Sequence, residues 1–336
     1  MSRSIPDMQR RYVFRADASP EMGTGHVMRL FSIIEEFLER KKEVLLVGSI
    51  QGVPWLEKRI ETLGNKLEFV GEHEFTSDHL RDVLIIDSYT LNPEGDFLDK
   101  KKWLRIVALI DLGTPKYKAD LYIHCGTNSK IEQEFKSQDS EFIGGLKYLP
   151  IRKQMHNIQF KPKIKKNDTP LRIVVVGGGT DPNNFVGQVA KELESLDSIF
   201  DAVLFASDNS ELSYLDSRFL TRTIGLELEN ELKSADLVLT LSGTSSWDYL
   251  SSGFPIGIVL GFENQRDNFE FQISNEIAID IGAFDKEKNF RIKKSNLLKL
   301  IENTDLRLKL SENSRFFIDQ HGAARIAKEI MKLRIQ

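Results

Sequence analysis

The feature that most constrains the fold is an alternation of short apolar runs with longer amphipathic stretches, which occurs twice along the 336 residues. In the first half, runs rich in valine, isoleucine and leucine predict strands at 11–17, 43–48, 67–70, 82–87, 105–111 and 121–125. The stretches between them predict helices at 25–40, 53–63 and 94–102. Near-continuous apolar strands separated by helical patterns are typical of a parallel sheet that is covered on both faces.

The same rhythm restarts after residue 170. Strands are predicted at 171–176, 202–207, 220–225, 237–241, 256–260 and 277–281. Helices are predicted at 183–196, 228–234, 244–252, 265–275, 294–302, 305–317 and 323–333. The chain therefore contains two α/β patterns of similar length.

The segment 151–170 interrupts the rhythm with six basic residues together with Pro162 and Pro170. A solvated linker is favoured over a nucleic-acid or membrane patch, because the segment shows no pattern of aromatic residues for stacking on bases and lies between two complete α/β patterns. We therefore predict an N-terminal domain at 1–155, a linker at 156–170 and a C-terminal domain at 171–336. The predicted fold class is α/β, with two Rossmann-like doubly wound domains that face a cleft, because open α/β sheets bind ligands beyond the carboxyl ends of their strands.

Composition excludes several classes of protein. Lys and Arg total 46 and Asp and Glu total 50, a formal net charge of −4, which argues against binding nucleic acid through bulk charge. No apolar run approaches the ~20 residues of a membrane-spanning helix, so stable membrane insertion is not expected. The single cysteine, Cys125, excludes an internal disulfide. We expect a cytoplasmic protein, and a monomer is compatible with the sequence.

The first candidate site lies after the strand at 11–17. Gly23 and Gly25 permit close backbone approach, and Thr24 suits the N-cap of the helix that follows. His26 would stand in the first helical turn, where the positive end of the helix disfavours imidazolium and leaves a neutral ring able to accept a proton. Asp17 could orient that ring. The alternative is a histidine that merely caps the helix.

A second candidate loop follows the strand at 171–176. It contains Gly177, Gly178, Gly179, Thr180 and Asp181. Consecutive glycines after a strand let backbone N–H groups face an anion, and Asp181 or Asn183 could cap the next helix. A plain tight turn is the alternative.

A third loop follows the strand at 237–241 and begins with Ser242 and Gly243. Free N–H groups at the start of the next helix, with the hydroxyls of Thr244 and Ser245, could hold a diphosphate. Asp248, one turn further on, could accept hydrogen bonds from ribose hydroxyls. A capped helix with a solvated Asp248 explains the same residues.

Polar residues follow three further strands. Glu263, Asn264 and Gln265 suit sugar or base groups, or form an N-cap pair. Tyr89 and two acids, Asp87 and Asp111, end strands of the first domain and could line the cleft, although either acid could cap a helix. The histidines show no H-E-x-x-H spacing, so no metal site is predicted. If His26 is not the base, Asp17 and Tyr89 are the next candidates.

The segment from Arg15 to Arg29 resembles the N-terminal signature of the UDP-2,4-diacetamido-2,4,6-trideoxy-β-L-altropyranose hydrolases of the pseudaminic acid pathway and of their SpsG-type relatives. That family is similar to GT-B glycosyltransferases of the MurG type. The other matching segments are 86–89, 145–152, 177–181, 242–248, 263–265 and 319–325. Two positions depart from the family pattern: Asp248 replaces a glutamate, and Asp111 is followed by Leu112 and Gly113 rather than by a second acid.

The resemblance implies hydrolysis of a UDP-sugar at its anomeric carbon, with inversion and without a metal or other cofactor. It further implies that the C-terminal domain holds UDP and that His26 is the general base on the attacking water. Two alternatives stay open. One is an inverting GT-B glycosyltransferase in which His26 deprotonates an acceptor hydroxyl, and the other is a nucleotide-sugar-binding module without catalysis, against which the presence of His26 counts.

Overall fold

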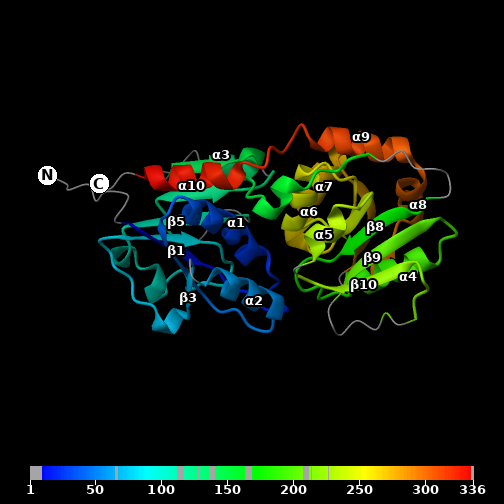
Figure 1. Ribbon diagram of the computed structural model, residues 1–336. Coiled ribbons are helices and arrows are strands. Elements are labelled where there is room, and N and C mark those ends of the chain that lie inside the picture. The colour runs from blue at the N-terminus through cyan, green and yellow to red at the C-terminus, as the bar shows by residue number, and fades with distance from the viewer. Residues whose placement is uncertain are drawn as a thin grey trace. The chain divides into compact units, whose positions relative to one another are not determined.

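The computed structural model describes residues 10–64, 67–111, 117–127, 129–135, 141–162, 169–206, 212, 214–225, 227–285 and 287–333. These residues form two compact units (Figure 1). Unit 1 contains the described residues up to Arg152 together with those from Gln320 onward, and unit 2 contains the residues from Lys153 to Asp319.

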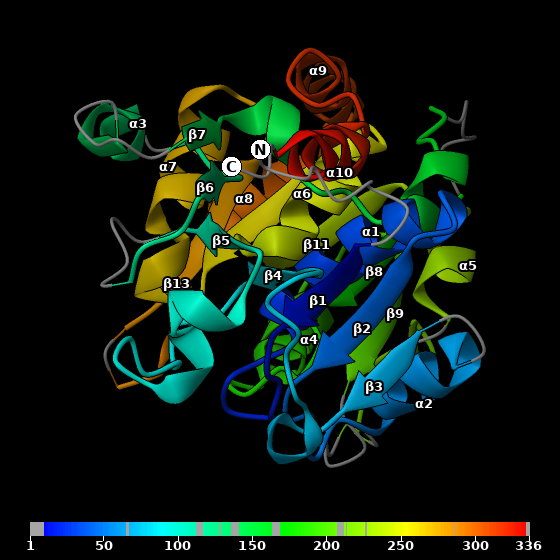
Figure 2. The same cartoon turned by 90° about the vertical axis from the view of Figure 1, so that its left-hand side faces the viewer.

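Unit 1 is built on a seven-stranded sheet in which all neighbouring strands are parallel. Its strands are β1 (Arg11–Arg15), β2 (Glu43–Val47), β3 (Glu68–Val70), β4 (Asp82–Ile86), β5 (Arg105–Ile110), β6 (Leu121–His124) and β7 (Glu141–Gly144). The order across the sheet is β3-β2-β1-β4-β5-β6-β7, which can be followed in Figure 2. The strand order reverses between β1 and β4, so their carboxyl ends form the switch point at which open α/β sheets bind ligands.

Helices cover the faces of this sheet. They are α1 (Gly25–Glu39), α2 (Pro54–Leu63), α3 (Ser129–Phe135) and α10 (Gly322–Lys332), with 3-10 turns η2 (Glu72–Glu74), η3 (Asp96–Leu98), η4 (Lys100–Lys102) and η5 (Leu146–Tyr148). The helix predicted at 94–102 is wrong, because that segment forms only η3 and η4. Asp99 follows η3 and Trp103 follows η4, and both residues are extended, so each turn stops after three residues.

The last helix corrects the predicted domain boundaries. The sequence assigned all of 171–336 to the C-terminal domain, but α10 packs against α1 in unit 1 (Figures 1 and 2). A Cβ atom on Gly322 would lie 1.9 Å from the carbonyl oxygen of Leu149, so only glycine permits this close approach. The apolar face of α10 is buried through Ala323, Ile326 and Ile330.

The predicted linker is corrected in the same way. Residues 163–168 lie outside the described residues, but the segment before them buries several of its apolar side chains. It begins with the 3-10 helix η6 (Lys153–Asn157). Met155, Ile158 and Phe160 are buried, and the Phe160 N–H donates to the carbonyl oxygen of Ser252 at 2.8 Å. Burial of these apolar side chains attaches the segment to unit 2.

Unit 2 repeats the strand order of unit 1. Its strands are β8 (Leu171–Val176), β9 (Phe200–Ala206), β10 (Phe219–Thr223), β11 (Leu237–Leu241), β12 (Ile256–Leu260), β13 (Ile279–Phe284) and β14 (Phe290–Ile292). Its helices are α4 (Phe185–Glu194), α5 (Leu228–Leu232), α6 (Thr244–Ser251), α7 (Arg266–Ser274), α8 (Lys294–Glu302) and α9 (Thr304–Ser314), with η7 (Glu263–Gln265). The order is β10-β9-β8-β11-β12-β13-β14, and β14 alone among these strands is antiparallel to its neighbour. The switch point lies between β8 and β11.

Candidate active site

His26 stands in the first turn of α1, as the sequence predicts. The loop from β1 reaches it through Gly23, whose φ of +79° lies in the left-handed region that favours glycine. Thr24 occupies the N-cap position, but its side chain accepts no hydrogen bond from the helix, so the capping role predicted for that side chain is wrong. The His26 side chain is largely buried, with 13% of its surface exposed.

The imidazole is oriented by Asp87, which directly follows β4. The Nδ1 atom of His26 lies 2.6 Å from Oδ1 of Asp87, whose side chain is 1% exposed. A carboxylate can only accept, so Nδ1 carries the proton and a neutral ring leaves a lone pair on Nε2. The Nε2 atom has no hydrogen-bond partner among the residues that the structure describes. This arrangement suits a general base.

Arg29 joins His26 to two carboxylates. Its Nε and Nη2 atoms donate to the two oxygens of Asp87 at 2.6 Å each, and Nη1 donates to Oδ1 of Asp111 at 2.6 Å. The hydroxyl of Tyr89 donates to the other Asp111 oxygen at 2.6 Å. The Tyr89 ring also packs edge-on against the His26 ring, with centroids 4.4 Å apart. These five residues form what we call the histidine network.

Attraction between Arg29 and the two carboxylates opposes the cost of burying charge in the histidine network. Burial alone would raise the pKa of Asp111, but the Arg29 charge holds it well below its usual range. Burial would likewise lower the pKa of Arg29, and the two carboxylates instead raise it well above its ordinary value. Partial burial and the charge of Asp111 raise the pKa of Tyr89, so the phenol stays protonated at neutral pH and keeps donating.

Asp17 does not orient His26, contrary to the sequence prediction. Its Oδ1 atom lies 2.6 Å from Nη1 of Arg15 and accepts the N–H of Ser49 at 2.8 Å. The Asp17 side chain therefore binds groups at the carboxyl ends of β1 and β2. Tyr89, by contrast, does lie against His26, although its hydroxyl is bound to Asp111 rather than directed at the ring nitrogens.

Replacing Asp87 by asparagine should lower turnover by about 10–100-fold, which is the cost of losing the carboxylate that orients a histidine at metal sites and serves here as the order of magnitude. The amide oxygen of asparagine can still accept the Nδ1 proton, but its NH2 group can instead donate to Nδ1, so the ring would populate both tautomers. NMR of the His26 ring nitrogens should show Nδ1–H in the wild type and a mixture in the variant. Asp111→Asn is the matched control, because it leaves the His26–Asp87 contact in place. Equal tautomer populations in the wild type and Asp87→Asn would contradict this assignment.

In unit 2, the glycine loop follows β8. Gly178 has a φ of +100°, and Asp181 and Asn184 also adopt positive φ. Both oxygens of Asp181 accept N–H groups at the start of α4, from Phe185 at 2.8 Å and Val186 at 3.0 Å. Asp181 is thus a helix cap, one of the two roles left open for it, and the backbone of Gly178, Gly179 and Thr180 remains as the candidate anion contact.

The start of α6 matches the predicted anion site more closely. The helix begins at Thr244 after Gly243, and no side chain caps it. The side chains of Thr244 and Ser245 are partly exposed and make no hydrogen bond within the described part of the chain. Asp248, expected to be solvated in the alternative interpretation, is 4% exposed instead.

The residues after β12 lie beside the α6 start. Ser242 donates to Oε1 of Gln265 at 3.4 Å, and a Cβ on Gly243 would lie 3.0 Å from Nε2 of the same side chain. Glu263 is exposed and paired with Arg266 at 2.6 Å, while Asn264 is exposed on η7. Because β8, β11 and β12 are neighbouring parallel strands, the three loops that follow them meet at the carboxyl ends of these strands.

The residues that the structure describes contain neither a candidate metal cluster nor a membrane-spanning helix. There, no group of three or more histidine, cysteine, aspartate or glutamate side chains could hold a metal ion. In the described part of the chain, no helix is both long and apolar enough to cross a bilayer. Burial raises the pKa of Cys125 to about 12, so its thiol stays protonated and is no nucleophile at neutral pH.

Two curated proteins are similar in sequence, and no protein-family model matches the chain. An uncharacterized protein of Methanocaldococcus jannaschii is 26% identical over 276 residues, which cover 76% of this chain and 56% of that protein. The chain thus spans little more than half of that relative's length. The UDP-2,4-diacetamido-2,4,6-trideoxy-β-L-altropyranose hydrolase of Campylobacter jejuni is 25% identical over 218 residues, or 61% of this chain and 73% of the hydrolase.

Solved structures extend the similarity to the fold. MurG of Acinetobacter baumannii superposes with a TM-score of 0.63 at 11% identity, covering 96% of this chain and all of that one. The S. aureus MnaA–UDP complex gives a TM-score of 0.63 at 15% identity and covers 96% of each chain. Two parallel-sheet α/β units of the GT-B type are therefore confirmed, as is the resemblance to the diacetamido-sugar hydrolase.

Proposed function

We propose that this protein hydrolyses a UDP-linked diacetamido-trideoxy sugar at C1, releasing UDP and the free sugar with inversion. The observation that carries the proposal is the His26–Asp87 pair, in which a buried carboxylate fixes Nδ1 and leaves Nε2 without a partner in the described residues. The similarity to the Campylobacter jejuni hydrolase supports the choice of sugar and a role in the biosynthesis of nonulosonic acids of the pseudaminic type.

In the proposed mechanism, Nε2 of His26 takes a proton from water as the water oxygen attacks C1. The new C–O bond forms on the face opposite the leaving group, and the bond between C1 and the diphosphate oxygen breaks. UDP leaves with that electron pair, so the configuration at C1 inverts. Asp87 and Arg29 keep the ring in place while its charge changes. A positioned base of this kind contributes ~10²–10⁴-fold.

UDP is proposed to bind at the edge of unit 2 where the loops after β8, β11 and β12 meet. The uncapped start of α6 offers free N–H groups and the positive end of the helix dipole to the diphosphate. These groups also stabilise the charge that grows on the leaving diphosphate. Structures of similar fold in complex with UDP and with thymidine diphosphate support the binding of a nucleotide by this protein.

Replacing Ser245 by aspartate should weaken UDP binding by about 10–100-fold, because a carboxylate close to the diphosphate repels it. The same carboxylate near a helix start stabilises the helix slightly, so folding should not suffer. Calorimetry with UDP measures the affinity. Ser295→Asp is a matched control, since Ser295 is also the second residue of an exposed helix start in unit 2. Unchanged UDP affinity in Ser245→Asp would remove α6 from the nucleotide site.

The reaction itself is tested by incubating the protein with UDP-2,4-diacetamido-2,4,6-trideoxy sugars in the absence of any acceptor. Release of UDP and free sugar, followed by NMR, is the expected result, and EDTA should leave the rate unchanged. The anomer that appears first reports inversion. An intact donor that reacts only after an acceptor glycan is added would instead establish a glycosyltransferase, which the similarity in fold to MurG also accommodates.

A further inference from the structure

A cavity of about 410 Å³ lies at the carboxyl ends of β1 and β2 in unit 1. This volume falls within the ~300–1,000 Å³ typical of small-molecule sites. Its wall includes Arg15 and Asp17 from the end of β1, Ser49 and Gln51 from the loop after β2, and Glu72 from η2. The histidine network does not contribute to this wall, and none of these residues has a part in the proposed hydrolysis step.

The cavity is tied to His26 by the chain on two sides. Ser19 and Met22, which line it, belong to the loop that leads into α1. Thr90 and Leu91, which also line it, directly follow Tyr89, whose ring packs against His26. Two loops that line the cavity are therefore also connected to the proposed base: one leads into the helix that carries His26, and the other carries the Tyr89 ring that packs against it.

The polar wall offers acceptors for hydrogen bonds. Arg15 is 4% exposed and lies between two carboxylates, with Nη1 2.6 Å from Oδ1 of Asp17 and Nη2 2.5 Å from Oε2 of Glu72. The second oxygens, Oδ2 of Asp17 and Oε1 of Glu72, have no partner among the described residues. The side chains of Ser49 and Gln51 likewise make no hydrogen bond there.

This chemistry selects the ligand class. In the wall of this first cavity one cation, Arg15, faces two carboxylates, so negative charge is in excess there and an anionic group held against this wall would be repelled. Free carboxylate oxygens require donors, such as hydroxyl or amide N–H groups. Ala18, Met22 and Leu91 add apolar surface suited to methyl groups. A neutral sugar that carries acylamino and deoxy groups meets all three requirements.

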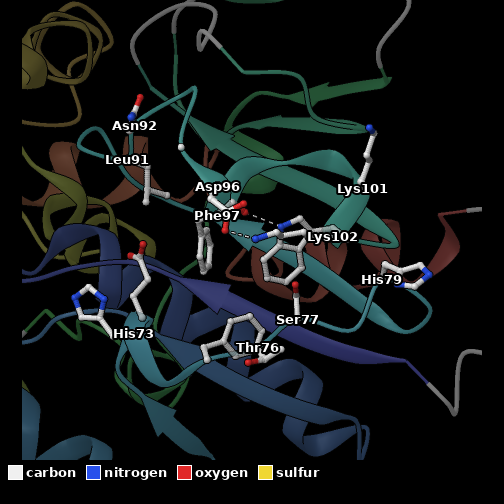
Figure 3. A pocket seen from close by; sticks show the side chains of 14 residues that line it. His73, Thr76, Ser77, His79, Leu91, Asn92, Asp96, Phe97, Lys101 and Lys102 are labelled. Atoms are coloured by element: carbon white, nitrogen blue, oxygen red, sulfur yellow. Dashed lines mark hydrogen bonds and ion pairs between the residues drawn. The ribbon is translucent and has the colours of Figure 1, made fainter.

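A second cavity, of about 510 Å³, adjoins the first and shares Glu72, Leu91 and Asn92 with it (Figure 3). Aromatic side chains form part of its wall, and the rings of Phe75 and Trp103 are stacked with centroids 5.6 Å apart. In Figure 3, Leu91 and Phe97 point into the same space. The second cavity thus extends the first with a mixed wall, in which aromatic rings on which an acyl group can pack lie beside Asp96, Lys101 and Lys102.

From these observations we propose that the cavity between the ends of β1 and β2 binds the acylamino-sugar portion of the substrate, with Asp17 and Glu72 accepting its N–H and O–H groups. The identity of the ligand in this inference rests on the proposed function, whereas the position and lining of the cavity do not. It gives Asp17 a binding role in place of the orienting role predicted from the sequence.

The test measures sugar binding without turnover. The probe is free 2,4-diacetamido-2,4,6-trideoxy-L-altrose, observed by saturation-transfer NMR at its acetyl methyl protons. We expect transfer in the wild type, at least a threefold loss in Glu72→Gln, and no transfer in Gln51→Trp, which fills the cavity from an exposed loop. Glu94→Gln, at an exposed carboxylate outside both cavities, should behave as wild type. N-acetylneuraminate, an anionic acylamino sugar, should give no transfer in the wild type.

The outcomes separate this inference from the proposed function. If the probe binds and Gln51→Trp abolishes binding while no UDP-sugar is hydrolysed, the cavity assignment stands and the hydrolase proposal fails. If hydrolysis occurs but Glu72→Gln and Gln51→Trp keep wild-type saturation transfer and wild-type KM, the cavity assignment is overturned. Equal binding of N-acetylneuraminate and the neutral probe would also overturn it, because the charge argument requires discrimination.

Discussion

Replacing His26 by asparagine is expected to lower turnover by roughly 10²–10⁴-fold, the range typical of a lost acid–base group. The affinity for UDP should change by less than about 0.5 kcal/mol, because sites without shared contacts respond independently. We expect turnover and UDP affinity to respond differently because His26 belongs to unit 1, whereas the proposed nucleotide loops belong to unit 2. Steady-state kinetics and UDP calorimetry on the same preparation measure the two effects.

The pH profile supplies a second readout. Protonation of a general base removes activity on the acidic side, and that limb should disappear in His26→Asn. His321→Asn is the matched control, since His321 is an exposed residue of unit 1 at the N-cap of α10, where asparagine also caps well. If His26 only capped its helix, the variant would melt earlier yet turn over normally when folded. That result would place the base elsewhere.

The sequence predicted the two sheets well because their central strands are buried on both faces. Strands such as β8 and β11 begin and end where the apolar runs do. The two strands that were missed lie at sheet edges: β7 is only partly buried, and β14 has three residues. An edge strand has one neighbour and one exposed side, so its sequence lacks the continuous apolar signal.

The partner of His26 was missed for a related reason. Asp17 is close to His26 in sequence, whereas Asp87 is 61 residues away and reaches it only because β4 lies beside β1. Pairing of β1 with β4 is a property of the strand order, which periodicity does not encode. Arg29 did carry a signal: it is three residues after His26, so both project from one face of α1. A basic pair on one helix face with acids at two strand ends predicts such a network.

Replacing Arg29 by methionine is expected to destabilise unit 1 by about 3–5 kcal/mol at neutral pH, the usual cost of removing one partner from a buried ion pair. Arg29 and Asp87 are 7% and 1% exposed, so water cannot replace the lost contacts. The measurement is a urea titration in a Trp247→Phe background, where Trp55 and Trp103 of unit 1 are the remaining fluorescent reporters. Arg40→Met is the control, because its Glu36 pair near the end of α1 is partly exposed and worth ~0–1 kcal/mol.

The loss of stability caused by Arg29→Met should become smaller as the pH falls, and the pKa of Asp111 explains this direction. In the wild type, Arg29 lowers the pKa of Asp111 in the folded state. The Asp111 carboxylate therefore stabilises the fold above its unfolded pKa of ~3.9. This stabilisation is lost as the pH falls through the lower pKa of the folded state. Without Arg29, burial is left to raise the pKa of Asp111. The charged form then destabilises the fold at pH 7, and protonation relieves it. The gap between the wild type and Arg29→Met should therefore narrow from pH 7 toward pH 4, whereas a gap that stays constant would mean that Arg29 acts through packing rather than through its charge.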